Sequence, residues 1–113
     1  MLVTLYCPCP TKGAARRLAR ALLARRLIAC ANLFPVEAHY RWKGRMVRAS
    51  ETVLLAKTQR QHIRAVTAAL AKLHPYELPG TEFFPVLAEA KFGKWVHAET
   101  ERPRGAFKGS RGR

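Results

Sequence analysis

Hydrophobic and polar positions in the first thirty residues predict a strand followed by an amphipathic helix. Residues 2–7 form a short β-branched and aromatic run, and the prolines at positions 8 and 10 end it because proline lacks a backbone N–H. The hydroxyl of Thr11 can cap a helix, and residues 14–28 are mostly strong helix formers. At about 100° per residue the apolar side chains share one arc. The opposite arc carries Arg16, Arg17 and Arg20.

The middle of the chain predicts a long hairpin. From 29 to 42 the helical period fades, and Pro35 indicates a bulge or an edge strand. Residues alternate between the two faces over 38–43, and the chain then turns at Gly44. Residues 46–57 are expected to return as the second strand, with an apolar stretch that could be buried on both faces.

A second helix is expected to begin at residue 58. Thr58 and Gln61 match the capping box, in which each side chain satisfies a free backbone N–H of the other residue. Pro75 prevents the helix from continuing, so it should end at His74. Apolar residues recur between these ends at helical spacing: Ile63, Val66, Leu70 and Leu73.

The last third of the chain predicts one more strand, one short helix and a tail. Residues 81–87 are a strand candidate, and residues 90–100 could form a helix with Phe92 and Trp95 facing inward. Residues 102–113 are basic and rich in glycine, and they offer too little apolar surface to order themselves. This segment is therefore expected to be a disordered basic tail.

These elements follow the order β-α-β-β-α-β with an added C-terminal helix. That order is typical of the ferredoxin-like α+β sandwich, a four-stranded antiparallel sheet covered by two helices on one face. At 113 residues and 49% apolar composition, the chain has material for one core, which we assign to residues 1–101. No stretch approaches the roughly 20 apolar residues of a membrane-spanning helix, so no membrane insertion is expected.

Charge is the outlying property of this sequence. There are 21 Lys and Arg against 7 acidic residues, which gives a formal net charge of +14. Such a surface would attract phosphates in a salt-dependent way, and the first predicted helix and the tail could hold nucleic acid. Nothing resembles a zinc finger, a KH loop or an RNP pattern, so any nucleic-acid attraction should be nonspecific. The alternative is an arginine-rich surface that is simply solvated.

Three cysteines indicate reduced thiols, because their number is odd and the chain can fold without disulfides; the cytoplasm is the expected compartment. Cys7 and Cys9 each precede a proline, which favours extended backbone and lets both thiols point the same way. Paired soft thiolates suit Cu(I), and zinc is possible with further ligands. Alternatively, both are small residues in a tight loop. Cys30 has apolar neighbours and is expected to be buried.

Two other residues are candidates for chemistry. His74 ends a predicted helix beside Tyr76, where it could cap the helix or bind a metal ion or an anion. Glu51 is an isolated carboxylate among basic residues, so it could form an ion pair or act as a ligand. The sequence has two serines, no aspartate and no nucleophile elbow, and we therefore do not expect an enzyme.

Four motifs in order resemble the CutA family of divalent cation tolerance proteins. They are LIACANL at 27–33, YRWKG at 40–44, Glu51 with the Lys-Thr pair at 57–58, and HPYELP at 74–79. The resemblance implies a ferredoxin-like subunit in a tight homotrimer, built through sheet edges with long hairpin strands wrapping neighbours. It also implies tolerance of copper and other divalent ions, and a trimeric form similar to that of the PII signalling proteins.

The resemblance also implies a site in a cleft between subunits. Its residues would be Tyr40, Trp42, Glu51, Lys57, His74 and Tyr76. Cys7 stands where some family members carry a copper-associated cysteine, with Cys9 beside it, and His74 is the other metal candidate. A second hypothesis is an anionic small molecule in the same cleft, held by Lys57, His74 and nearby arginines.

Three departures from the family pattern bear on this site. Thr11 stands where an acidic residue is usual, Gly80 replaces a common glutamate, and Phe92-Gly93 replaces Tyr-Leu. Losing two carboxylates should weaken a site for hard divalent ions and favour soft metals or anions. The net charge is also atypical, because the family tends toward acidic surfaces.

Overall fold

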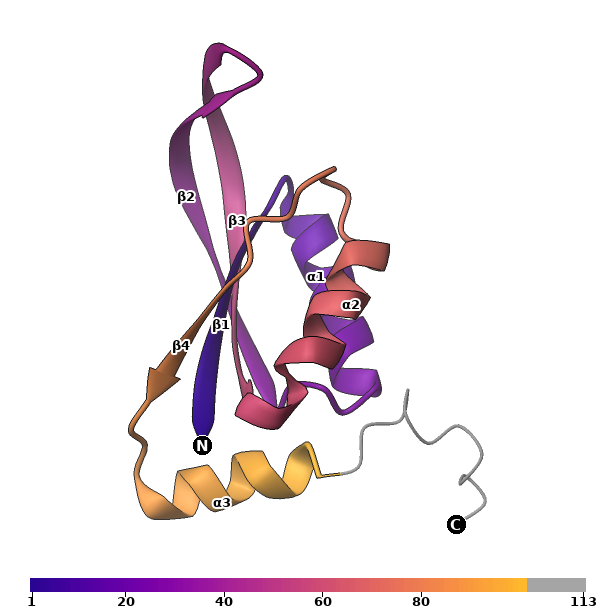
Figure 1. Ribbon diagram of the computed structural model, residues 1–113, viewed down its shortest axis with the longest axis vertical. Coiled ribbons are helices and arrows are strands. Elements are labelled where there is room, and N and C mark those ends of the chain that lie inside the picture. The colour runs from indigo at the N-terminus through magenta and orange to yellow at the C-terminus, as the bar shows by residue number, and fades with distance from the viewer. Residues whose placement is uncertain (102–113) are drawn as a thin grey trace.

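Residues 1–101, described by a computed structural model, form an antiparallel sheet in the order β2-β3-β1-β4 with two helices packed on one face (Figure 1). This is the predicted ferredoxin-like α+β fold. The tail expected at 102–113 lies outside the described residues. In chain order the elements are β1 (Leu2–Cys9), α1 (Lys12–Ala24), β2 (Cys30–Trp42), β3 (Arg45–Gln59), the 3-10 turn η1 (Arg60–His62), α2 (Ile63–Leu73), β4 (Glu82–Val86) and α3 (Ala90–Glu99).

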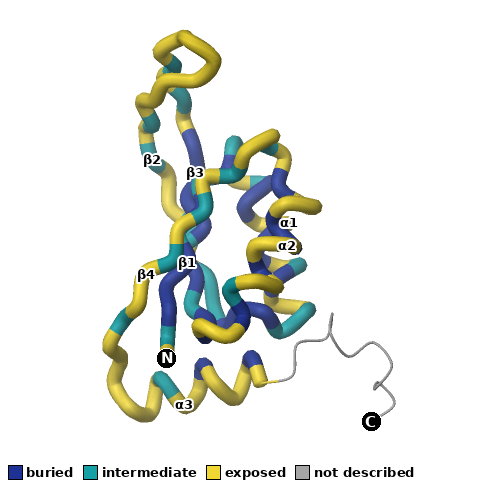
Figure 2. Tube along the Cα trace, viewed as in Figure 1, coloured by how far each residue is buried: buried dark blue, intermediate teal, exposed yellow. Residues whose placement is uncertain are grey.

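The first helix has the predicted cap but ends four residues before the run of helix formers at 14–28 does. The Thr11 hydroxyl accepts a hydrogen bond from the backbone N–H of Ala14 at 3.0 Å, which confirms the predicted cap. The helix ends at Ala24, and the left-handed Arg26 (φ 57°) then redirects the chain toward β2. Figure 2 shows that buried and exposed residues alternate along this helix, and Arg16, Arg17 and Arg20 are among the exposed ones. The buried side comprises Ala14, Ala15, Leu18, Ala19 and Leu22.

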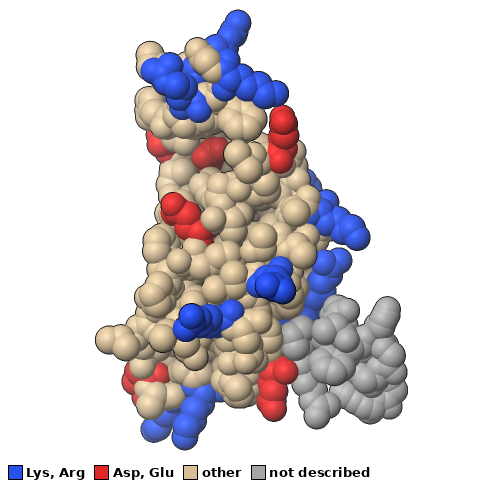
Figure 3. Space-filling model, viewed as in Figure 1, with Lys and Arg blue, Asp and Glu red and all other residues tan. Residues whose placement is uncertain are grey.

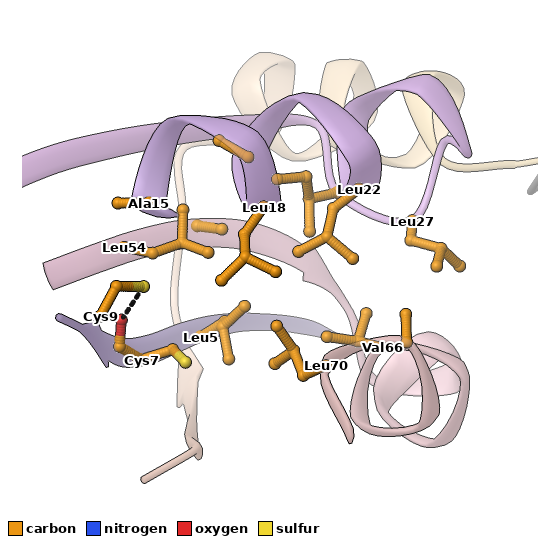
Figure 4. Close-up of a cluster of buried hydrophobic side chains, with 14 of the residues drawn as sticks. Leu5, Cys7, Cys9, Ala15, Leu18, Leu22, Leu27, Leu54, Val66 and Leu70 are labelled. Carbon is orange, nitrogen blue, oxygen red and sulfur yellow. Dashed lines mark hydrogen bonds between the residues drawn. The ribbon is translucent and has the colours of Figure 1, made fainter. Parts of the chain in front are cut away.

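The two faces of the sheet differ in burial. Side chains at odd positions of β1, such as Leu5 and Cys7, join the core beneath the helices (Figure 4). The opposite side, which we call the open face, has no helix from residues 1–101 packed across it. Phe34 and Phe84 on this face are 37% and 45% exposed. The register also places Tyr6, Val36 and Leu55 there.

The β2–β3 hairpin is longer than the rest of the sheet. It pairs without a bulge from Cys30↔Lys57 to Trp42↔Arg45, whereas β1 pairs with β3 only as far as Cys9↔Thr52. The predicted turn at Gly44 is confirmed, with a positive φ of 79°. Pro35 lies on the edge strand β2, as one of its two interpretations required. The tip of the hairpin therefore projects beyond the helices (Figure 1).

The predicted capping box at Thr58 is wrong. Thr58 still belongs to β3, where it pairs with Val3, and its hydroxyl donates a hydrogen bond to the carbonyl of Leu27 at 2.6 Å. Sheet pairing and a buried hydrogen bond therefore override the local helix signal. The chain then makes the turn η1, and α2 begins at Ile63.

Two burial predictions are also corrected. Phe92 and Trp95 do not face inward but are 37% and 43% exposed, and they stack on each other with ring centroids 5.8 Å apart. The reason is that α3 runs across one end of the sheet, where Val96 takes the buried position (Figure 1). Cys30 is only partly buried, because it begins an edge strand. Within residues 1–101 no helix has the length and apolar character needed to cross a membrane.

Candidate functional site

Two thiols and one imidazole meet at the end of β1. Cys7 and Cys9 lie on the helix-facing side of that strand and are fully buried, while His74 follows the last turn of α2 and is 7% exposed. Their candidate ligand atoms all lie within 4.8 Å of one another. The Cys9 thiol donates to the carbonyl of Cys7 at 3.5 Å (Figure 4), and the Cys7 sulfur lies 4.0 Å from the hydroxyl of Thr81. We call Cys7, Cys9 and His74 the thiol cluster.

Both ring nitrogens of His74 are engaged. Nε2 donates to the carbonyl of Pro8 at 2.9 Å, and Nδ1 accepts from the backbone N–H of Tyr76 at 3.0 Å, which places the ring proton on Nε2. The side chain therefore joins β1 to the loop after α2, and it does not bond the final carbonyls of its own helix. A metal ion at Nε2 would have to replace the contact with Pro8.

The two cysteines differ in acidity. The neighbouring Cys9 thiol stabilises a Cys7 thiolate by hydrogen bonding, and this lowers the pKa of Cys7 although burial opposes it. The pKa of Cys9 is raised, because the same contact holds its proton and because burial disfavours a second thiolate. Cys7 is therefore the first of the pair to ionise, and a soft cation would displace the proton of Cys9 last.

A groove lies on the other side of the β1 end. Because the hairpin continues past β1, the loop between α2 and β4 can fold against it and enclose a volume of about 480 Å³. This brings together four residues that the family resemblance grouped: Tyr40, Trp42, Glu51 and Tyr76. The full lining is Pro8, Tyr40, Trp42, Glu51, Pro75, Tyr76, Glu77, Leu78 and Gly80.

Lys57 and His74 do not line this groove within one chain. Lys57 pairs with Thr4, six residues along β3 from Glu51, which is about 20 Å at the usual rise of a strand. His74 lies behind the groove, with its ring tilted against Tyr76 at a centroid distance of 5.1 Å. A single chain therefore divides the expected residue set between a groove, a buried cluster and a distant lysine.

Glu51 is held by a phenol and not by a cation. The hydroxyl of Tyr76 donates to its carboxylate at 2.5 Å, and Glu51 itself is 7% exposed. The pKa of Tyr76 is raised, first because the phenol is desolvated and then because it donates a hydrogen bond to the negatively charged Glu51 carboxylate. The ion pair expected for Glu51 is not among those found in residues 1–101. Here the carboxylate positions the loop on the hairpin.

The lining of the groove does not favour an anion. It contains two carboxylates and three aromatic side chains, and it includes no Lys or Arg. At its rim, the ammonium of Lys43 lies 3.4 Å from the carboxylate of Glu77 and 5.6 Å from the centroid of the Trp42 ring. Aromatic rings next to carboxylates accommodate neutral or cationic groups. The anion hypothesis therefore finds no support in the groove of one chain.

Replacing Tyr76 with phenylalanine should destabilise the fold by about 1–2 kcal/mol, because the buried Glu51 carboxylate loses its donor. Urea unfolding at fixed protein concentration measures this. Tyr40→Phe is the matched control: Tyr40 lines the same groove and is 41% exposed, so its loss of a hydroxyl should cost less than about 0.5 kcal/mol. Equal losses in the two variants would contradict the role given to the Tyr76–Glu51 contact.

Sequence reasoning missed a polar cluster at the opposite end of the sheet. Gln59 donates to the hydroxyl of Thr100 at 2.8 Å, and its carbonyl lies 2.8 Å from Nδ1 of His97. His62 is buried nearby, and its Nε2 has no hydrogen-bond partner within the described part of the chain. The two histidines lacked any spacing signal, because α3 returns to this end only through tertiary packing. The cluster fastens α3 to β3.

Stability should fall as the pH is lowered below about 6.5, the usual histidine value. Burial lowers the pKa of His62, so the unfolded chain takes up this proton at a higher pH than the folded chain does. The loss of stability begins near pH 6.5 and ends once the pH falls below the lowered pKa of His62 in the folded chain. Urea unfolding between pH 7.5 and 5.5 tests this: His62→Gln should flatten the dependence, whereas the exposed His39→Gln should retain it. Identical profiles in the two variants would refute the assignment.

Comparison with known proteins gives consistent matches. Residues 3–99 match the family model described as CutA1 divalent ion tolerance protein. Protein CutA of Mus musculus is 36% identical over 98 residues, which are 85% of this chain and 55% of that protein. The chain thus spans about half the length of the first curated relatives it matches. The Divalent-cation tolerance protein CutA of Pectobacterium atrosepticum is 34% identical over 85% of this chain and 89% of that protein.

Solved structures show the same similarity. The Divalent cation tolerance protein (Cut A1) from Thermus thermophilus superposes with a TM-score of 0.85 at 30% identity, covering 88% of this chain and 99% of that one. The Periplasmic divalent cation tolerance protein CutA from Archaeoglobus fulgidus has a TM-score of 0.86 at 27% identity, with coverage of 88% and 99%. These TM-scores show that both neighbours share the fold of this chain over their aligned lengths.

Proposed function

This chain belongs to the CutA1 family of divalent ion tolerance proteins, and from that premise we propose that it contributes to metal-ion tolerance by binding copper in the thiol cluster. The observation that carries the proposal is the burial of Cys7, Cys9 and His74 with their ligand atoms within 4.8 Å of one another. Thiolate and imidazole donors suit Cu(I) and zinc better than hard ions such as magnesium.

The two thiols are the principal ligands in this proposal. Cys7 ionises first, and binding of Cu(I) supplies the positive charge that would let Cys9 ionise as well. His74 can join as a third ligand through Nε2 if that nitrogen gives up its proton and its hydrogen bond to Pro8, or through Nδ1 if that nitrogen gives up its hydrogen bond from Tyr76. Thiolate binding is therefore expected to dominate the affinity, with a smaller contribution from His74.

Titration of the fully reduced protein tests the proposal. With a competing Cu(I) chelator present, we expect saturable binding of one Cu(I) per chain with release of protons, weaker binding of Zn²⁺ and none of Mg²⁺. Absence of saturable binding of Cu(I) would overturn the copper assignment. Equal binding of Mg²⁺ would show that carboxylates, and not the thiol cluster, hold the metal.

We further propose that the working unit is a homotrimer. The open face supports this, since Phe34 and Phe84 leave apolar surface uncovered on a sheet whose other face is packed against helices. The edge strand β2 carries the projecting hairpin, which gives it the length to reach a neighbouring copy. Covering the open face with two further copies would remove this surface from water.

A cytoplasmic binding protein without catalytic activity is the remaining part of the proposal. All three cysteines are free thiols, and two of them are fully buried, which suits a reducing compartment. The thiol cluster holds donors for a soft ion, and the groove holds a carboxylate that is already engaged by Tyr76. Both features support binding rather than chemistry on a bound substrate.

A further inference from the structure

The outer surface of α1, η1 and α2 carries only positive charge. No acidic residue occurs between positions 1 and 36 or between 52 and 76, and these two stretches contain α1, η1 and α2. Figure 3 shows Lys and Arg side chains on the side of the molecule where these helices lie, without an acidic side chain between them. We call the exposed part of this surface the basic helix face. It comprises Lys12, Arg16, Arg17, Arg20, Arg64 and Lys72.

The cations of this face are not neutralised within the chain. The three ion pairs found in residues 1–101 use His39, Lys43 and Arg48, all on or beside the hairpin. The acidic residues lie on the hairpin, in the loop after α2, and in the segment from β4 onward. A charge separation of this kind within one small domain creates a positive field on one side, which attracts a polyanion.

The spacing of these side chains suits a regular row of phosphates. Lys12, Arg16 and Arg20 follow one another at intervals of four residues, so they form a stripe about 12 Å long on α1. One strand of a nucleic-acid duplex rises about 3.4 Å per phosphate, so this length corresponds to three or four phosphates. Arg64 and Lys72 are eight residues apart on α2, which packs beside α1.

The rest of the face distinguishes between polyanions. Neither α1 nor α2 contains an aromatic residue that could stack on an unpaired base, so single strands gain little from it. Its exposed large apolar side chains are Leu23 and Leu73, at 40% and 38%, which are too few to anchor a helix in a lipid surface. Guanidinium groups without aromatic neighbours instead suit the backbone of a duplex, with no reading of sequence.

We propose that the basic helix face binds the phosphate backbone of double-stranded nucleic acid without sequence preference. The face lies on the side of the sheet opposite the open face, so it stays accessible whether or not the open face is covered. It also lies apart from the side chains of the thiol cluster, which are buried beneath the helices. Duplex binding and metal binding can therefore succeed or fail independently.

The test compares two variants of equal charge. In the first, Arg16→Gln, Arg17→Gln and Arg20→Gln remove three charges from the basic helix face; in the second, Arg45→Gln, Lys91→Gln and Lys94→Gln remove three exposed charges elsewhere. Glutamine keeps the side chain long and has a helix propensity close to that of arginine. Binding to a fluorescein-labelled duplex of 20 base pairs is followed by anisotropy from 50 to 200 mM salt.

We expect the unmodified protein to bind the duplex at 50 mM salt and to lose affinity steeply as salt rises. The variant with the three arginine substitutions on α1 should bind the duplex at least 10-fold more weakly than the unmodified protein. The slope of its log K against log salt should be smaller in magnitude by about 2–3. The control variant should stay within about twofold. Equal losses in both variants, tighter binding of a single strand of the same length, or binding of phosphatidylglycerol vesicles but not of the duplex would each overturn the proposal.

Discussion

Replacing Cys7 with serine should weaken Cu(I) binding by more than about 100-fold. Serine keeps the size and the strand geometry of the site but removes the thiol that ionises first. Changes to residues that merely support a ligand already cost about 10- to 100-fold in metal affinity, so loss of a ligand should cost more. Competition between the reduced protein and a Cu(I) chelator measures the affinity, and circular dichroism shows whether the variant retains its fold.

The chain supplies its own matched control for this result. Cys30→Ser makes the same atomic change at a partly buried thiol outside the cluster, and it should leave Cu(I) affinity within about twofold. Cys9→Ser should resemble Cys7→Ser, and it serves as the second variant should one of them fold poorly. His74→Ala should have a smaller effect than either, because its ring nitrogens are engaged by Pro8 and Tyr76. A loss with Cys30→Ser equal to that with Cys7→Ser would contradict the thiol cluster as the site.

Placing a charge on the open face should dissociate the proposed trimer. Phe34 is 37% exposed in one chain, so Phe34→Glu would be tolerated by a monomer but would bury a carboxylate in a trimer. At micromolar concentration, light scattering should return about three times 12.7 kDa for the unmodified protein and about 12.7 kDa for Phe34→Glu. Several kcal/mol of desolvation per buried charge is enough to shift such an equilibrium by orders of magnitude.

Leu23→Glu is the corresponding control on the other side of the molecule. Leu23 is 40% exposed on α1, so the change in side chain and in exposure is similar while the position is away from the open face. This variant should keep the mass of the unmodified protein. A mass of about 12.7 kDa for the unmodified protein would refute the trimer, and dissociation by both substitutions would refute the open face as the interface.

Elements fixed by neighbouring residues could be predicted from the sequence. The Thr11 cap, the arginine face of α1 and the turn at Gly44 each depend on contacts within a few positions. The start of α2 could not be predicted in this way, because the capping pattern at Thr58 competes with pairing to Val3, which lies 55 positions away. Long-range pairing decides such conflicts, and no local signal reports it.

In the candidate site, too, local features could be predicted from the sequence and long-range contacts could not. Strand alternation and the two prolines already placed the thiols of Cys7 and Cys9 on one side of the chain. The family resemblance named His74 as another metal candidate, but nothing in the sequence indicated that its ring lies next to the thiols, 65 or more positions away along the chain. The contact between Tyr76 and Glu51 joins a loop to a strand 25 positions apart, and no spacing rule predicts it.

The central position of β1 has a consequence for synthesis of the chain. β1 is made before both of its partners, β3 and β4, and β4 ends at Val86. At about 5–20 residues per second, a ribosome needs several seconds to deliver the second partner after the first strand has emerged. During that interval β1 can pair with the β2–β3 hairpin, but its other edge has no partner until β4 is made. The nascent chain is therefore expected to be open to aggregation through this edge of β1 until β4 is released.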